Sequence, residues 1–303
     1  MGRLEDLRIN AYLSKVARGY SNSAFIAENL FPTIESELEK IDIFEFNKEA
    51  FQVYDTERSI RANSNVISPK GFTKKTTTLT EHDLAYPLDY REQEESKIVK
   101  LQLHATNVVT EGLKLKHEKQ CADLVQNPDN YATENKIILS GSSRFSDPGS
   151  DPEKIIDDAK SAIAGKVAQE PNTMVMGYEA FKDLKKNENL RKLVGSSSTR
   201  IITLELMKEI FDVEKIVVGK SVFVNEQNQF VKVWGNNIVL AYVPTLNSRT
   251  EYDPSFAYTV KKKEALKIDE YSKEGNKVKY IRATDIYTPF LVGPDAGYLI
   301  ANA

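Results

Sequence analysis

The first 45 residues combine one short amphipathic stretch with a polar linker, which is the pattern of an arm rather than of a domain. The apolar positions of the stretch are Leu7, Ile9, Tyr12, Leu13, Val16 and Tyr20. Pro32 is expected to end any helix near Leu30. The helix could pack on its own domain or lie on a neighbouring molecule, and the sequence leaves both arrangements open.

Residues 41–90 have the alternation of extended structure but few apolar side chains. The segment IDIFEF alternates apolar and polar residues with the period of a strand, and TKKTTTLT has high β propensity. Between them lies SNVISPKG, which is rich in turn-forming residues. This pattern predicts a long hairpin with almost no core, and a two-stranded hairpin alone is only marginally stable in water. The segment is therefore either a mobile surface loop or rests on something outside its own domain.

A long helix is predicted over residues 91–126, which contain no proline. Apolar or small residues recur there at alternating spacings of three and four, as expected for one helical stripe. The stripe consists of Ile98, Leu101, Ala105, Val108, Gly112 and Leu115. At about 1.5 Å per residue the helix is roughly 50 Å long. It is thus a candidate backbone for an elongated domain, and the sequence NPDN at 127–130 ends it.

Helices and strands alternate between residues 151 and 245. Asp151 has the position of an N-cap with Pro152 behind it, and the helix that follows should run to about Lys166. TMVMG predicts a buried strand, YEAFKDLKK a helix, and TLELMKEIFD a second helix capped by Thr203. EKIVVGKSVFV, FVKVWG and NNIVLAYV read as strands. The sequence WGNN at 234–237 predicts a tight turn that joins the last two as a hairpin, with Trp234 packed on the core.

The closing segment, residues 245–303, returns to alternating runs. Gly275 and Asn276 lie between two such runs and predict a β-hairpin. Together with the preceding helices, this pattern indicates an α+β protein.

Composition excludes some classes of protein. The net charge of −3 differs from the strongly basic balance of proteins whose main task is to bind nucleic acid. Cys121 is the only cysteine, so no intrachain disulfide can form. The N-terminal sequence lacks the apolar core of a secretory signal. No stretch approaches the ~18–20 apolar residues that span a bilayer, so we expect no membrane association.

One short motif resembles part of a phosphate-binding loop. Gly219, Lys220 and Ser221 match the tail of that loop, which requires a second glycine five residues earlier so that backbone amides surround the phosphates. That position is Glu214, whose carboxylate would repel phosphate, and no helix is predicted to follow. We therefore expect no nucleotide at this motif.

The histidines and the cysteine give little support for catalysis or metal binding. His117 and Cys121 are four residues apart on the predicted long helix, so they share a face and could supply two metal ligands. The simpler arrangement is a partly buried thiol beside a surface histidine. The other histidines are His82 and His104, and no G-x-S-x-G motif is present. We expect no catalytic residue, no cofactor and no metal.

The basic run of Lys261, Lys262 and Lys263 also has two interpretations. It is typical of a solvated sheet edge, where lysines discourage edge-to-edge aggregation. The alternative is a contact with nucleic acid.

The order of these parts resembles the major capsid proteins of tailed bacteriophages, which share the HK97-type fold. An arm is followed by a hairpin without a core, a long helix, a Gly/Ser connection, an α/β block and a closing β segment. Three stretches are similar to the family's axial domain. They are PNTMVMG with YEAFKDLKKN, FDV leading into IVVGK, and VWGNNIVLAYVP.

Carried over by position, this resemblance implies an α+β, HK97-type capsid fold in four parts. Residues 1–45 would be the N-terminal arm and 46–88 the extended β-hairpin loop. Residues 89–150 and 246–303 would form the peripheral domain, which includes the spine helix. Residues 151–245 would form the axial α/β domain.

The resemblance also implies a function and partners. Copies of the chain would assemble into hexamers and pentamers of an icosahedral head around double-stranded DNA, which they would contact non-specifically. Assembly would take place in the host cytoplasm. Some relatives carry a cleaved scaffolding segment that this sequence lacks. Either a separate scaffolding protein exists or the sequence is the mature product, and the initiating Met1 favours the first. Portal and decoration proteins are further partners that the resemblance allows. The alternative is an encapsulin-like bacterial nanocompartment shell, which has the same fold and encloses an enzyme cargo.

Overall fold

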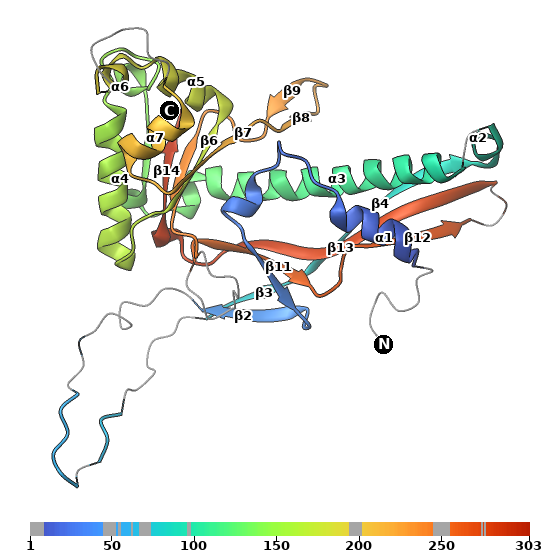
Figure 1. The fold of residues 1–303 in the computed structure, drawn as a ribbon, viewed down its shortest axis with the longest axis horizontal. Helices are drawn as coiled ribbons and strands as arrows, with labels where there is room; N and C mark the ends of the chain where they lie inside the picture. The colour runs from blue at the N-terminus through green and yellow to red at the C-terminus, as the bar shows by residue number, and fades with distance from the viewer. Residues whose placement is uncertain are drawn as a thin grey trace.

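The computed structural model describes residues 9–44, 53, 56–61, 63–66, 74–95, 98–193, 202–244, 255–273, 275 and 277–303. Within these residues the fold is α+β, as predicted, and two five-stranded sheets organise it. One sheet extends along the longest axis of the molecule, and the other lies at one end, covered by helices (Figure 1). They are called the elongated sheet and the compact sheet below.

The elongated sheet is built around its longest strand, β13. Its strands are β1 (Thr33–Ser36), β4 (Thr80–Asp89), β11 (Ala257–Lys262), β12 (Lys267–Ser272) and β13 (Val278–Leu291). The order is β1–β11–β13–β12, and β4 also pairs with β13. Strand β1 runs parallel to β11, and the other pairs are antiparallel. The hairpin predicted near Gly275 is confirmed by the β12–β13 pair, although Asn276 lies outside the described residues.

The predicted long helix is confirmed as α3 (Ile98–Gln126), which follows the short helix α2 (Tyr90–Glu95). It lies along the elongated sheet (Figure 1). Its buried apolar side chains are Ala105, Val109, Leu113, Cys121, Ala122 and Val125. The predicted stripe is partly wrong, because Val108 is 40% exposed. The buried face also contains Thr106, Thr110 and Glu118, which a count of apolar residues does not include.

The amphipathic stretch near the N-terminus forms α1 (Ala11–Gly19), with Asn10 as its N-cap. Leu13 and Ala17 are buried in a cluster with residues of α3, β12 and β13. The hydroxyl of Ser14 bonds both the backbone N–H and the carbonyl of Ile268. Of the two arrangements left open by the sequence, the structure therefore has the helix on its own chain.

The compact sheet contains the most buried strands of the molecule. Its order is β5–β14–β10–β6–β7, formed by β5 (Lys136–Ile138), β6 (Thr173–Gly177), β7 (Lys215–Gly219), β10 (Ile238–Ala241) and β14 (Gly297–Ala301). The helices of this part are α4 (Pro152–Val167), α5 (Tyr178–Lys186), α6 (Glu188–Leu193) and α7 (Leu204–Phe211). The predicted caps are confirmed: the side chain of Asp151 accepts the N–H of Lys154, and that of Thr203 accepts the N–H of Leu206.

Short 3-10 helices join several of these elements. They are η1 (Ala27–Asn29), η3 (Pro128–Asn130), η4 (Thr133–Asn135), η5 (Gly141–Ser143) and η6 (Pro294–Ala296). The first ends just before Pro32, as predicted.

The base of the predicted long hairpin is present. Strand β2 (Lys40–Phe44) pairs antiparallel with β3 (Lys74–Thr78), with Lys40 opposite Thr78. Most of the connection lies outside the described residues. Its described parts, 56–61 and 63–66, lie well away from both sheets (Figure 1).

The hairpin predicted around 234–237 is wrong in its pairing. The turn exists and Trp234 is buried, but the preceding strand β9 (Phe230–Lys232) pairs with β8 (Val222–Val224). Strand β10 instead pairs with β6 and β14. The reason is burial: all four residues of β10 are buried, which suits a central strand, whereas β9 is largely exposed.

The sheets also bear on the four parts expected from the resemblance. Strands β5 and β14 belong to segments assigned to the peripheral domain, yet both pair within the compact sheet, beside strands of the expected axial domain. The exact boundaries of the four parts remain a prediction.

Candidate functional site

A buried carboxylate on α3 joins three separate parts of the chain. Glu118 accepts hydrogen bonds from the backbone N–H groups of Ile26 and Ala27, with N–O distances of 2.8–3.1 Å. The indole N–H of Trp234 donates to its Oε1 at 2.6 Å, and the Ser221 hydroxyl donates to the same oxygen at 3.4 Å. The side chain thus holds the N-terminal segment and the β7–β10 region on the same turn of the helix.

The environment of Glu118 acts on its charge in two directions. Burial raises the pKa of this carboxyl, while hydrogen bonds from Ile26, Trp234, Ala27 and Ser221 oppose the rise. An ionised carboxylate accepts hydrogen bonds more strongly than a neutral acid does. The four donors therefore compensate for the removal of the charge from water.

Two further side chains of α3 hold the N-terminal segment by polar contacts. The Tyr20 hydroxyl donates to Glu111, and the side-chain amide of Asn22 donates to the same carboxylate at 2.7 Å. The ammonium of Lys114 donates to the backbone carbonyl of Tyr20. Glu111, Lys114 and Glu118 lie three and four residues apart, so they share one face of the helix. This face positions residues 20–27 across the spine of the molecule.

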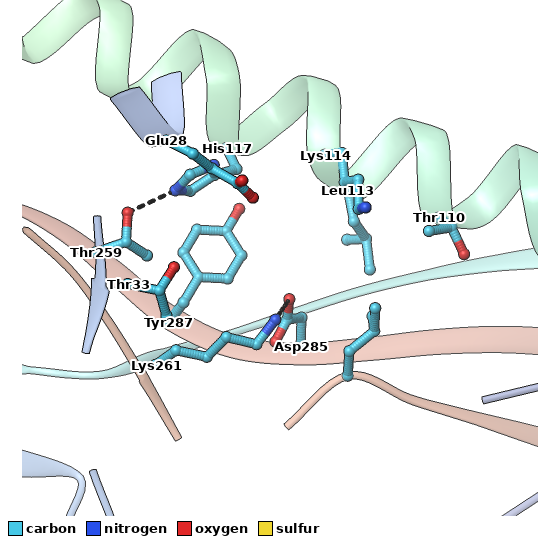
Figure 2. Close-up of a pocket in the computed structure, with 11 residues that line it drawn as sticks. Glu28, Thr33, Thr110, Leu113, Lys114, His117, Thr259, Lys261, Asp285 and Tyr287 are labelled. Atoms are coloured by element: carbon cyan, nitrogen blue, oxygen red, sulfur yellow. Dashed lines mark hydrogen bonds and ion pairs between the residues drawn. The ribbon is translucent and has the colours of Figure 1, made fainter. Parts of the chain in front are cut away.

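A small polar pocket lies between α3 and the elongated sheet (Figure 2). Its volume is about 70 Å³. A ring nitrogen of His117 hydrogen-bonds with the Thr259 hydroxyl at 2.8 Å, and Lys261 pairs with Asp285 at 2.8 Å. The Tyr287 ring lies between these two pairs (Figure 2). The His117–Thr259 bond links α3 to β11, whereas the Lys261–Asp285 pair links β11 to β13 within the sheet.

Burial lowers the pKa of His117 to about 4, and Lys261, His82 and Lys114 add to this effect by charge repulsion. The imidazole is therefore neutral at neutral pH. His82 stacks against Tyr287, with ring centroids 4.4 Å apart, and burial lowers the pKa of His82 as well.

His117 and Cys121, whose spacing could supply two metal ligands although no metal was expected, are close in space. The Sγ atom of Cys121 lies 3.4 Å from Nε2 of His117. The expectation of a surface histidine beside a partly buried thiol is wrong, because Cys121 is fully buried and His117 faces the pocket. In the part of the chain that the structure describes, no group of three His, Cys, Asp or Glu side chains could hold a metal ion. Burial also raises the pKa of the Cys121 thiol. His104 lies elsewhere, on an exposed part of α3 near Tyr86.

The motif that resembles a phosphate-binding loop has a structural role. Gly219 ends β7, and a Cβ atom there would lie 2.2 Å from Cδ1 of Trp234. Ser221 is buried and donates to Glu118. The next element is the strand β8 rather than a helix. The glycine and serine thus accommodate the buried tryptophan.

All three lysines of the basic run have carboxylate partners in the chain. Besides the pair of Lys261 with Asp285, Lys262 lies 2.9 Å from Glu39, and Lys263 lies 3.6 Å from Glu37. Strand β11 lies between β1 and β13, so the prediction of a sheet edge is wrong. The run joins β11 to its neighbours.

Sequence reasoning did not single out Glu118, although a signal was present. It lies at helical spacing from Cys121 and Val125, so an acidic residue falls within the buried stripe.

No helix in the described part of the chain is long and apolar enough to cross a membrane.

Comparisons with known proteins agree with this arrangement. The profile of the family described as "Phage major capsid protein E" matches residues 56–255. The major capsid protein of Burkholderia phage BcepMu is 45% identical over 306 residues, which cover 100% of this chain and 99% of the relative. The crystal structure of a phage-related protein from Bordetella bronchiseptica RB50 has a TM-score of 0.81 and 29% identity, with 99% of both chains covered.

A more distant solved structure supports the fold alone. The mature capsid of bacteriophage PhiM1 matches with a TM-score of 0.51 and 13% identity, covering 93% of this chain and 87% of that chain. The chain therefore belongs to the phage major capsid protein E family, and it is a major capsid protein of the HK97-type fold that forms the shell of the virion.

Proposed function

We propose that copies of this chain form the hexamers and pentamers of an icosahedral head that encloses double-stranded DNA. One observation carries this proposal: the described residues between β2 and β3 project from the body and expose apolar side chains. Val53, Ile60 and Val66 are 96%, 93% and 88% exposed. Burying one such side chain stabilises by roughly 1.5–3 kcal/mol. A segment of this kind is suited to rest on another copy.

The proposal assigns the chain no catalytic role and only non-specific contact with DNA. The ion pairs of Lys261, Lys262 and Lys263 favour a structural role for the one basic run that the sequence suggested for DNA. His117, the most buried histidine candidate, bonds to Thr259 and faces a pocket of about 70 Å³. A pocket of this size suits water better than a substrate.

The proposed partners are a separate scaffolding protein, a portal protein, decoration proteins and the packaged DNA, with assembly in the host cytoplasm. Co-expression with a candidate scaffolding protein tests the first of these. Uniform closed shells should form with that protein, and irregular sheets or tubes without it. Uniform shells in its absence would remove the scaffolding protein from the proposal.

Electron microscopy of the purified protein under assembly conditions tests the main proposal. Closed shells or capsomers with five and six subunits are expected, and a strictly monomeric particle would contradict it. The nanocompartment alternative differs in contents. Nucleic acid in particles isolated from infected cells supports the phage head, whereas a single protein cargo would support the alternative.

A further inference from the structure

Two buried threonines of α3 differ in what their hydroxyl groups contact. Thr106 and Thr110 are four residues apart on the helix, and both are fully buried. The hydroxyl of Thr106 donates to the backbone carbonyl of Gln102 in the same helix at 2.8 Å. The hydroxyl of Thr110 has no hydrogen-bond partner among the residues that the structure describes. A buried hydroxyl without a partner is unfavourable, and most such groups in proteins are bonded either to protein or to ordered water.

Thr110 lines the small polar pocket between α3 and the elongated sheet (Figure 2). The pocket volume of about 70 Å³ exceeds the ~10–15 Å³ that a single water molecule requires. A buried water typically forms about three hydrogen bonds with polar groups that would otherwise lack a partner. The pocket therefore has room for water, and Thr110 supplies one group that such a water would satisfy.

Other groups on the pocket wall have hydrogen-bonding capacity left. An ammonium group has three N–H donors, and Lys261 uses one of them on Asp285. That carboxylate accepts from Lys261 and from the backbone N–H of Ile286, although a carboxylate offers about four acceptor positions. Lys114 likewise uses one donor, on the backbone carbonyl of Tyr20. A small molecule that both donates and accepts would find partners of both kinds.

The charges around the pocket favour a neutral occupant. Two cations, Lys114 and Lys261, line it together with two carboxylates, Glu28 and Asp285. Burial keeps the imidazole of His117 neutral at neutral pH, because it lowers the pKa of that group. The carboxylates repel an anion and the ammonium groups repel a cation, so an ion of either sign gains little net attraction. Water carries no net charge and suits the mixed donors and acceptors.

Solvent has a route to this pocket. A second cavity, of about 290 Å³, shares Glu28, Lys114 and His117 with it. Residues 18–22 of the N-terminal segment also line the second cavity, and Glu28 is exposed. Water can therefore enter along the N-terminal segment and reach the contact between helix and sheet.

We propose that the pocket is a water-binding site, in which an ordered water bonds the hydroxyl of Thr110 and links α3 to the Lys261–Asp285 pair of the sheet. This water is part of the folded subunit and does not depend on assembly. It adds a second polar link between helix and sheet to the direct bond of His117 with Thr259. Removal of the Thr110 hydroxyl should therefore destabilise the subunit.

Thr110→Val tests the site, because valine has nearly the shape of threonine and lacks the hydroxyl. Without a bound water, the substitution would remove an unpaired buried hydroxyl and stabilise the protein. With the proposed water, it removes a hydrogen bond, and the equilibrium constant of unfolding should rise roughly three- to tenfold. Urea unfolding of the unassembled protein, followed by the emission of the buried Trp234, measures this constant.

Thr106→Val is the matched control on the same helix. Its hydroxyl bonds to a carbonyl that the helix already uses, so its removal should leave the unfolding constant near the wild-type value or lower it. An unfolding constant of Thr110→Val that falls, or that changes only as much as in the control, would overturn the inference.

A structure that resolves ordered water gives a direct test that does not depend on the stability of a variant. Density for a water about 2.5–3.0 Å from the Thr110 hydroxyl is expected in the wild-type protein. Crystals soaked in bromide or in rubidium should show no anomalous peak in the pocket. Absence of the water density at the Thr110 hydroxyl, or an anomalous peak there, would overturn the inference.

Discussion

Glu118 can be replaced by two side chains that separate its charge from its ability to accept hydrogen bonds. Glu118→Ala removes the acceptor from four donors, two of which are the indole N–H of Trp234 and the hydroxyl of Ser221. Each buried donor left without a partner costs about 1–3 kcal/mol. The backbone N–H of Ala27 is one of the other two donors, and Ala27 lines a cavity of about 290 Å³. Water in this cavity can accept the hydrogen bond of that N–H when the carboxylate is removed. With two or three donors left unsatisfied, we expect a loss of roughly 3–6 kcal/mol in the free energy of unfolding.

Glu118→Gln should cost much less, about 1–2 kcal/mol. The glutamine carbonyl still accepts two of the hydrogen bonds. The substitution also removes a buried charge, and burial is the reason that the pKa of Glu118 is raised. The order of stability should therefore be wild type, then Gln, then Ala.

Urea unfolding of the unassembled protein measures these differences through tryptophan fluorescence. Trp234 is the only tryptophan of the chain and donates directly to Glu118, so its emission reports on the site. An Ala variant within about 0.5 kcal/mol of wild type, the usual size of the effect of a surface substitution, would refute the reasoning. A Gln variant as unstable as the Ala variant would show that the charge, and not the acceptor geometry, holds the junction.

Three further predictions follow from the same contacts. The pKa of His117 is lowered from 6.5 to about 4 in the folded protein, so the unfolded chain takes up a proton first as the pH falls. The free energy of unfolding should therefore decrease between these two pH values. Unfolding measured from pH 7 to 4 should show a smaller decrease in His117→Gln. Gly219→Ala should cost about 1–3 kcal/mol by overpacking against the buried tryptophan, whereas Gly165→Ala, in open space on α4, should be neutral or stabilising in thermal denaturation. Lys261→Met should lower the melting temperature by leaving its carboxylate partner buried without a cation, with little change in DNA binding by a gel-shift assay.

Local patterns predicted individual elements well. The cap at Asp151 and the proline behind it specify where α4 begins, because these residues act on the first turn alone. The turn near Gly275 likewise predicted the β12–β13 hairpin. Each of these features depends on residues that are close in the sequence, so the local residue types are sufficient to predict where the helix begins and where the chain turns.

Strand partners could not be predicted in the same way. Strands β9 and β10 are adjacent in the sequence and both apolar, yet β10 pairs with β6 and β14, the second of which lies some 60 residues further along. Apolar strands offer similar backbone groups to any neighbour, so burial across the whole sheet decides the order. The same non-local effect placed Glu118 at the junction, since its donors come from residues 26–27 and 221–234.

The place of β14 within the compact sheet has a consequence for how the subunit folds. Strand β5 pairs with β14, whose residues follow it by about 160 positions. Until residues 297–301 have been synthesised and have inserted, the edge of β10 that they cover stays open and β5 has no partner in the sheet. Contacts between such distant segments slow folding. Closure of the compact sheet is therefore a late event, and subunits caught before it would present open strand edges that favour aggregation over ordered assembly.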